Sequence, residues 1–136
     1  MNNYNYFDPF NNYFINKDNI NNTLFGTYEG YIKGNMFKNL YEQYKNYKPL
    51  NVSISNEKEE ALFNLNQICF AMHELNLYLD VHPNDSSALN MFVNYENTYN
   101  NLLQEYQKKY GPINVNDVNG NTPFSWVGTN FPWEVK

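Results

Sequence analysis

A single proline divides the most regular part of this chain into two long segments with helical spacing. Val81-His82-Pro83 interrupts the first segment, which starts near residue 56, and Tyr110-Gly111-Pro112 ends the second. The residue before a proline is driven out of the helical conformation, so Pro83 ends the first helix. Gly111 fits a left-handed terminating position, and Pro112 prevents continuation. We expect helices over 56–81 and from Asn84 or Asp85 to Tyr110, running antiparallel because the connection is so short.

Both expected helices carry apolar residues at three- and four-residue steps. Asn56 followed by Glu59 also predicts a capping box at the first helix start. The first stripe comprises Leu62, Leu65, Ile68, Cys69, Met72, Leu75 and Leu79. The second comprises Leu89, Phe92, Tyr99, Leu103, Tyr106 and Tyr110, flanked by Met91, Tyr95 and Leu102. We expect Tyr99, Tyr106 and Tyr110 in the core and leave Tyr95 open; Phe70, Leu77 and Tyr78 form a second apolar face that something else must cover.

Cys69 is the only cysteine, so an internal disulfide is impossible. It belongs to the apolar stripe of the first helix. There a thiol acts as a small hydrophobe, and burial raises its pKa and lowers its reactivity. We therefore expect Cys69 to be an inert core residue.

The chain upstream of residue 55 divides into two parts. Residues 1–25 are rich in Asn and aromatic residues without a clear period, a composition typical of disorder. Within 26–50, Gly30 and Gly34 bracket a short segment, after which Asn35 can cap a helix that reaches Tyr47. Its apolar face is predicted from Phe37, Leu40 or Tyr41, Tyr44 and Tyr47. A helix this short needs a docking surface, either the hairpin or a partner.

Residues 55–136 form the third part, and their C-terminal portion is rich in both aromatic residues and chain breakers. Two helices alone bury too little apolar surface for a stable core. We expect the segment after Gly111 to be an extended strap along the hairpin, with rings filling grooves between the helices. The predicted fold is all-α: an antiparallel two-helix hairpin, a shorter upstream helix and an extended aromatic C-terminal tail.

Charge and composition exclude several function classes. The net charge is −5 and the nine basic residues are scattered lysines, which disfavours nucleic-acid binding. No apolar run approaches the roughly 20 residues that span a bilayer. The first residues have neither the basic region nor the apolar core of a signal peptide, so we expect synthesis in a cytoplasm.

The sequence offers no pattern typical of a catalytic site. His73 and His82 lack the partners of a zinc-protease or di-metal helix motif. We expect His82 to cap carbonyl groups at the first helix end, and Asp80 and Asp85 to cap the turn. A metal-binding enzyme that uses these three residues is the rival hypothesis. No cofactor is predicted.

The ordered motifs resemble those of the CotJB family of bacterial spore-coat proteins. The resemblance covers about residues 56–136. It depends on the sequence before Pro83, on Tyr110-Gly111-Pro112, on Pro123-Phe124-Ser125-Trp126 and on Phe131-Pro132-Trp133-Glu134. Residues 29–49 are similar to CotJA, a small coat protein commonly encoded beside CotJB. This resemblance implies a structural, non-enzymatic protein of the spore coat, made in the mother cell. The implied partners are a manganese catalase-like coat protein and CotJA-like proteins.

Aromatic residues make up 18% of the chain, which fits either an AT-rich genome or an assembly protein. Rigid rings with polar tips are enriched at binding hot spots. The predicted partner contacts are Tyr41, Tyr44, Tyr47, Phe124, Trp126, Phe131 and Trp133. The predicted structural motif residues are Asp80, His82, Pro83, Gly111 and Pro112. Besides the metal-enzyme hypothesis, a passive filler of the coat that assembles with itself stays open.

Overall fold

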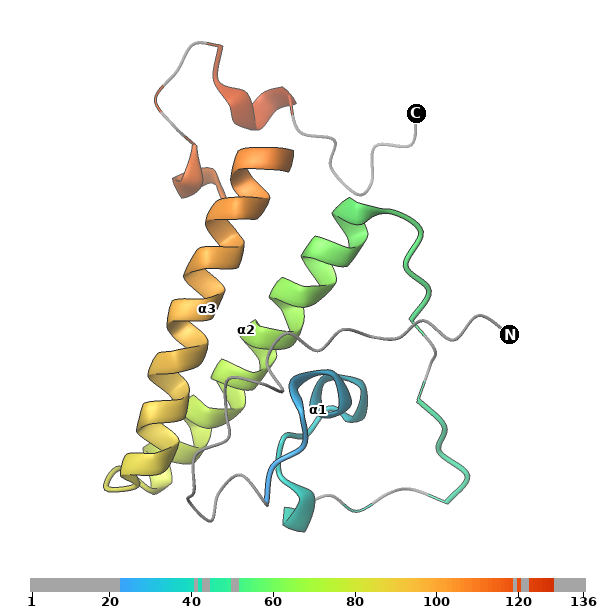
Figure 1. Cartoon of the computed structure of the whole chain (residues 1–136), viewed down its shortest axis with the longest axis vertical. Coiled ribbons are helices and arrows are strands. Elements are labelled where there is room, and N and C mark those ends of the chain that lie inside the picture. Colours follow the sequence, from blue (N-terminus) through green and yellow to red (C-terminus); the bar gives the residue numbers. More distant parts are fainter. Residues whose placement is uncertain are drawn as a thin grey trace.

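The computed structural model describes residues 23–40, 42, 45–49, 52–118, 120 and 123–128. Its elements are α1 (Thr27–Lys33), η2 (Lys38–Leu40), α2 (Glu57–Val81), α3 (Ser86–Tyr110), η3 (Val115–Asp117) and η4 (Ser125–Gly128). Figure 1 shows α2 and α3 as a long hairpin, with α1 against its lower half. The predicted all-α hairpin with a shorter upstream helix is confirmed. Most of the Asn-rich segment 1–25 lies outside the described residues.

Local signals set both ends of α2 and the start of α3. The Asn56 side chain accepts a 2.9 Å hydrogen bond from the backbone N–H of Glu59, as a capping box requires. The Glu59 carboxylate returns to the backbone N–H of Ser55 at 2.7 Å, one residue earlier than in the standard box. At the turn, His82 is the C-cap of α2 and Asp85 is the N-cap of α3. The predicted hairpin boundaries therefore hold to within one residue.

The upstream segment forms a motif of residues 23–40 that differs from the prediction. The expected helix from Asn35 to Tyr47 is wrong: the helix is α1, and it ends at Gly34, whose φ of 69° is left-handed. After Gly34 the chain reverses, so that Leu24 and Phe37 form an antiparallel bridge. The physical reason is that the two glycines are used differently. Gly34 terminates the helix, whereas Gly30 lies inside it and allows another segment to approach closely.

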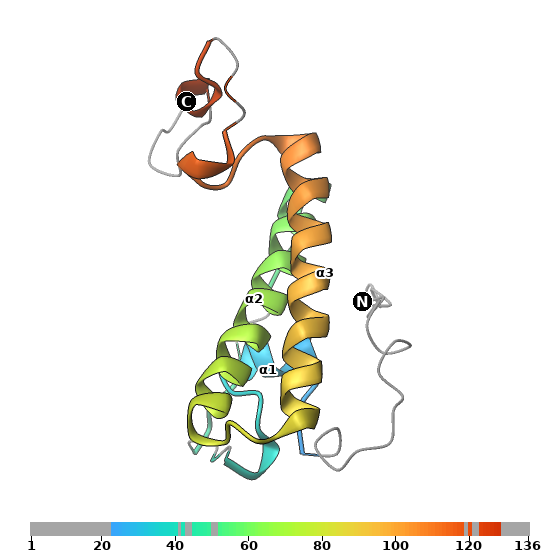
Figure 2. The ribbon, with the colours of Figure 1, turned by 90° about the vertical axis from the view of Figure 1, so that its left-hand side faces the viewer.

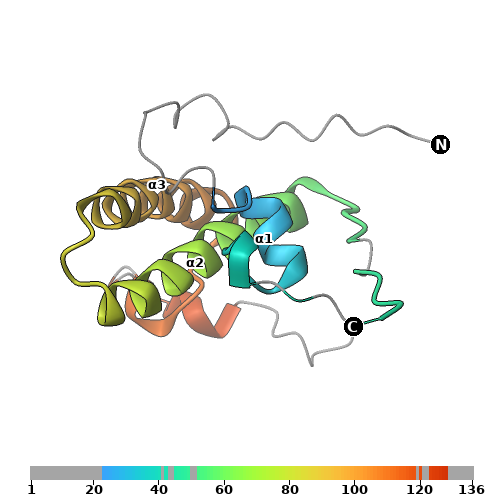
Figure 3. The ribbon, with the colours of Figure 1, turned by 90° about the horizontal axis from the view of Figure 1, so that it is seen from below.

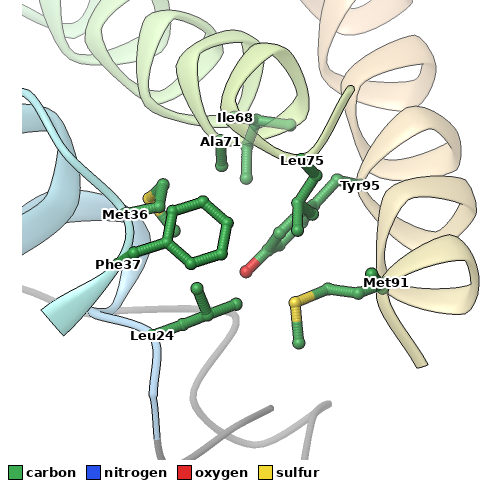
Figure 4. Packing of buried hydrophobic residues seen from close by; sticks show 9 residues of the cluster. Leu24, Met36, Phe37, Ile68, Ala71, Leu75, Met91 and Tyr95 are labelled. Atoms are coloured by element: carbon green, nitrogen blue, oxygen red, sulfur yellow. The ribbon is translucent and has the colours of Figure 1, made fainter. Parts of the chain in front are cut away.

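This α1 motif covers one side of the hairpin. Figure 3 shows α1 beside α2, and the two helices are in direct contact. Of the two docking alternatives for the upstream segment, the structure thus shows docking onto the hairpin. Leu24, Met36 and Phe37 enter a shared core with Ile68, Ala71 and Leu75 of α2 and with Met91 and Tyr95 of α3 (Figure 4). Of the second apolar face predicted for the first helix, Phe70 and Tyr78 contact the α1 motif, whereas Leu77 stays exposed.

The core is rotated toward the α1 motif relative to the predicted stripes, although Leu65, Ile68, Leu75 and Tyr106 are buried as predicted. The buried positions of α2 include Phe63, Ile68, Ala71 and Leu75, together with Leu65 and Gln67. Those of α3 are Ala88, Met91, Tyr95 and Tyr106. Tyr95, which the sequence left open, is buried, whereas Tyr99 and Tyr110 are half-buried. The rotation follows from the α1 motif, because α2 must turn part of its apolar surface toward a third element.

Cys69 is the clearest correction to the predicted core. The side chain of Cys69 is exposed. Leu62 and Leu89, also predicted in the core, have exposed fractions of 38% and 49%. The expectation of a buried Cys69 is therefore wrong. Helical spacing placed it with Leu65 and Met72, but the side of α2 on which it lies is turned away from the α1 motif.

The C-terminal segment stands at the open end of the hairpin. Gly111 has a positive φ of 97°, as expected, but its ψ of 178° is extended rather than left-handed helical. Figure 2 shows η3 and η4 near and beyond the last turn of α3, on the side where α2 lies. Phe124 is 51% exposed, so the predicted filling of a groove by its ring is wrong. Phe131 and Trp133 lie outside the described residues.

Candidate interaction surface

Aromatic side chains attach α1 to the middle of α2. The ring of Tyr31 meets those of Phe63 and Phe70 edge-on, at centroid distances of 5.5 and 5.8 Å. Tyr28 meets Phe63 in the same way at 6.0 Å. Edge-to-face pairs of this kind add about 0.5–1.5 kcal/mol each beyond the burial of their area. The α1 motif is therefore held by a specific aromatic arrangement.

Met36 is the second anchor of the α1 motif. Its side chain is fully buried, and its backbone N–H donates a hydrogen bond of 3.2 Å to Oε2 of Glu74 on α2. A Cβ at Gly30 would lie 2.3 Å from the Met36 sulfur, so only glycine leaves room for it. A backbone donor, a carboxylate and a buried thioether thus fix the motif on one side of the hairpin.

The hairpin turn is organised by a stack of three rings. Phe37 stacks on Tyr78 at 5.1 Å, and Tyr78 stacks on His82 at 4.3 Å with an interplanar angle of 7°. The Tyr78 hydroxyl donates to Asp85 at 3.0 Å, and this bond raises the pKa of Tyr78. A ring nitrogen of His82 lies 3.2 Å from the Tyr78 carbonyl oxygen, in line with its predicted capping role. The α1 motif thus contacts the turn as well as the helix.

Asp85 is hydrogen-bonded within the turn. Its carboxylate accepts the backbone N–H of Ala88 at 3.0 Å, and this bond is the main reason that its pKa lies below the usual range. The other oxygen accepts the Tyr78 hydroxyl. Asp80 is exposed on the last turn of α2. Across the described residues, no group of three His, Cys, Asp or Glu side chains is placed to hold a metal ion.

The predicted partner contacts fall into two separate regions. Tyr47 is 41% exposed and follows η2, which lies near the turn end of the hairpin, whereas Phe124 precedes η4 at the other end (Figure 1). Trp126 is half-buried. Tyr41 and Tyr44, like Phe131 and Trp133, lie outside the described residues. The structure therefore does not bring the predicted contacts that it describes into one site.

A further apolar surface lies on the side of the hairpin that faces away from α1. We call it the open face and define it by Leu62, Cys69, Met72 and Leu79 of α2 and by Leu89, Phe92, Tyr99 and Leu103 of α3. Leu62, Cys69 and Leu89 are exposed and the other five residues are half-buried. Burial, together with the neighbouring ionisable groups Cys69 and Asp117, raises the pKa of the Tyr99 hydroxyl. Sequence reasoning found these residues as an apolar stripe but assigned them to the core.

None of the helices that the structure describes is both long and apolar enough to cross a membrane. The described long helices carry exposed apolar side chains, and Tyr78, His82 and Asp85 of the turn are engaged in hydrogen bonds.

The comparison with protein-family models matches most of the described hairpin to a known family. The family model described as CotJB protein matches residues 59–134, which is more than half of the 136-residue chain. Neither a curated protein nor a solved structure matches the chain. The matched range contains nearly all of α2, the whole of α3 and the C-terminal segment with its Trp-Pro motifs. Through this match the chain belongs to the CotJB protein family, which is a family of bacterial spore-coat proteins.

Proposed function

We propose that this protein is a structural adaptor of the spore coat that binds a manganese catalase-like coat protein. Family membership supports the coat role. The observation that supports binding is the apolar side-chain surface that stays exposed, namely Leu62 and Leu89 on the long helices and Tyr47 and Phe124 outside them. Aromatic side chains of this kind are enriched at binding hot spots.

We further propose that the upstream segment supplies in one polypeptide what a separate CotJA-like protein supplies elsewhere. The docking of residues 24–37 onto α2 supports this idea, because the contacts of Tyr31, Met36 and Phe37 are those of a bound partner. They use aromatic anchors and a backbone hydrogen bond, which are the usual means of helix recognition. The remaining CotJA-like residues follow η2 in the sequence, as far as residue 49.

Co-purification from sporulating cells tests the adaptor role. A tagged full-length chain should retain the manganese catalase-like protein, and Tyr47→Ala combined with Phe124→Ala should reduce the retained amount several-fold. Val52→Ala is a matched control, because Val52 is 43% exposed yet carries no ring. All variants should keep the helical circular dichroism of the parent, since the altered side chains are largely outside the core. Equal retention by all three proteins would contradict the assigned contacts, and no retention by the parent would contradict the adaptor role.

A further inference from the structure

The α1 motif of residues 23–40 holds its shape through bonds of its own. The backbone N–H of Phe25 donates to the Met36 carbonyl oxygen at 2.8 Å, and the backbone N–H of Lys38 donates to the Thr23 carbonyl oxygen at 2.8 Å. The motif is attached to α2 by ring contacts and by a hydrogen bond. None of these contacts requires the motif and the hairpin to belong to the same chain. The motif is therefore a unit that fits its docking site with or without a covalent connection to it.

Residues 41–56 connect the motif to α2. Every described residue of this connection is exposed except Ile54, which is half-buried. The described part of the connection contains no helix or strand. The position of the motif is therefore determined by the motif's own contacts, and the connection acts as a tether.

The tether has to span most of the length of the hairpin. Phe37 stacks on Tyr78, which is about 32 Å along α2 from Glu57, the first residue of that helix. Figure 1 shows η2 at the turn end of the hairpin and the start of α2 at the opposite end. If two hairpins lie side by side and antiparallel, the start of α2 in one copy is next to the turn of the other, at a distance of about 10 Å between helix axes. The tether thus has a shorter way to the docking site of such a neighbour than to its own.

We propose that two copies of this chain pair antiparallel and exchange their α1 motifs, so that each motif docks on α2 of the other copy. Exchange of an identical element is a low-cost route to a symmetric dimer, because each docking site receives the contacts that it already makes within one chain. A flexible tether provides an effective concentration of about 1 mM. Docking within one chain prevails in dilute solution, and exchange prevails where the protein is more concentrated, as in an assembled coat. This inference does not depend on the manganese catalase-like partner.

The distribution of charge suits a second copy as the occupant of the site. Residues 26–50 have four lysines and two carboxylates, a net charge of +2, whereas residues 51–128 have three lysines and nine carboxylates, a net charge of −6. Opposite charge on the two parts attracts the upstream segment of one copy to the hairpin of another and raises the rate of association. A second copy supplies both this charge and the rings that fit the site.

Shortening the tether tests the exchange. Deletion of residues 41–52 leaves four residues before α2, which span at most about 17 Å. The motif then cannot reach the Tyr78 end of its own α2, whereas an antiparallel neighbour is within reach. Short hinges promote exchange for this reason. Light scattering should give twice the mass of a single chain for the shortened protein, and one chain mass of 16.2 kDa for the parent in dilute solution.

Two controls show whether the dimer uses the motif. Replacement of residues 41–52 by twelve Gly and Ser residues removes the same side chains but keeps the length, and should leave the protein monomeric. Met36→Asp in the shortened chain places a charge in a fully buried site of the motif, and should return the mass to that of one chain. The proposal is overturned if the shortened chain is monomeric, if it has lost its helical circular dichroism, or if either control is dimeric at the same concentration.

A second experiment keeps the full length of the chain. Met36→Asp disables the motif, and Phe63→Asp combined with Phe70→Asp disables the site that receives the rings of α1. Each variant alone should have the mass of one chain, because neither has both a working motif and a working site. An equimolar mixture at about 1 mM, the effective concentration that a tether provides, should give a species of twice that mass with one chain of each kind. A mixture that stays at the mass of one chain, or a dimer of either variant alone, would refute the exchange.

Discussion

Replacing Gly30 by alanine tests how the α1 motif is attached. In most helix interiors alanine is more favourable than glycine by about 1 kcal/mol. Here the new Cβ would lie 2.3 Å from the Met36 sulfur, far inside the contact distance. Met36 is fully buried, so surrounding atoms prevent its side chain from moving away. Overpacking of this kind costs about 1–3 kcal/mol. We therefore expect a net loss of stability of about 1 kcal/mol, where helix propensity alone predicts a gain.

A double-mutant cycle separates the two contributions. Met36→Ala alone should destabilise the protein by about 2–5 kcal/mol, because it empties a fully buried site. In that background the clash is absent, so Gly30→Ala should become stabilising by about 0.5–1 kcal/mol. The interaction energy is then about 1–3 kcal/mol, whereas the effects of mutations at distant sites add to within about 0.5 kcal/mol. Urea unfolding followed by circular dichroism measures all four proteins.

Gly120→Ala is the matched control, since its Cβ would meet no atom within 4 Å. It should leave the urea midpoint nearly unchanged. The reasoning fails if Gly30→Ala has the same effect with Met36 present and absent, because the cost would then come from the helix itself and not from the packed sulfur.

Three further predictions concern individual contacts. Asp85→Ala should cost about 1 kcal/mol as a lost helix cap, whereas Asp85→Asn should keep the cap and remove its pH dependence. Because the native pKa of Asp85 is lowered, its contribution to folding stability is present above the unfolded-state pKa and is lost as the pH falls through the native pKa. Measurement of the stability of both variants as a function of acidic pH checks this. Glu74→Ala should cost about 1–3 kcal/mol by leaving the buried Met36 N–H unpaired, and Glu74→Gln, which retains an acceptor, should cost less in urea unfolding. Lys109→Gln should leave the melting temperature unchanged at physiological salt, because its 2.6 Å pair with Glu57 is fully exposed.

The boundaries of the long helices were predictable because short-range rules decide them. Pro83 excludes helix at the preceding residue, Asn56 can satisfy an amide only from the N-cap position, and Gly111-Pro112 cannot continue a helix. None of these effects depends on what the helices pack against. They were therefore visible in the sequence, and the structure reproduces them to within a residue.

The upstream motif was not predictable from the same rules. The spacing of Phe37, Tyr41, Tyr44 and Tyr47 fits a helix, but residues 34–37 are needed to reverse the chain and pair with Leu24. Gly30 looked like a boundary because glycine usually weakens helices. Its role depends on Met36, six residues later, and on the α2 surface that buries both. Non-local packing outweighs local propensity here, as it often does for short helices.

The direction in which each long helix faces depends on partners that periodicity does not identify. Both α2 and α3 have apolar residues over more than half of their circumference, so two different stripes satisfy the helical period. The small residues Ala71 and Ala88 are fully buried at the centre of the actual core, yet they carry little weight in an apolar stripe. Of the stripes chosen from the sequence, Leu65, Ile68 and Leu75 are in the core as predicted, whereas Leu62, Cys69 and Leu89 are exposed.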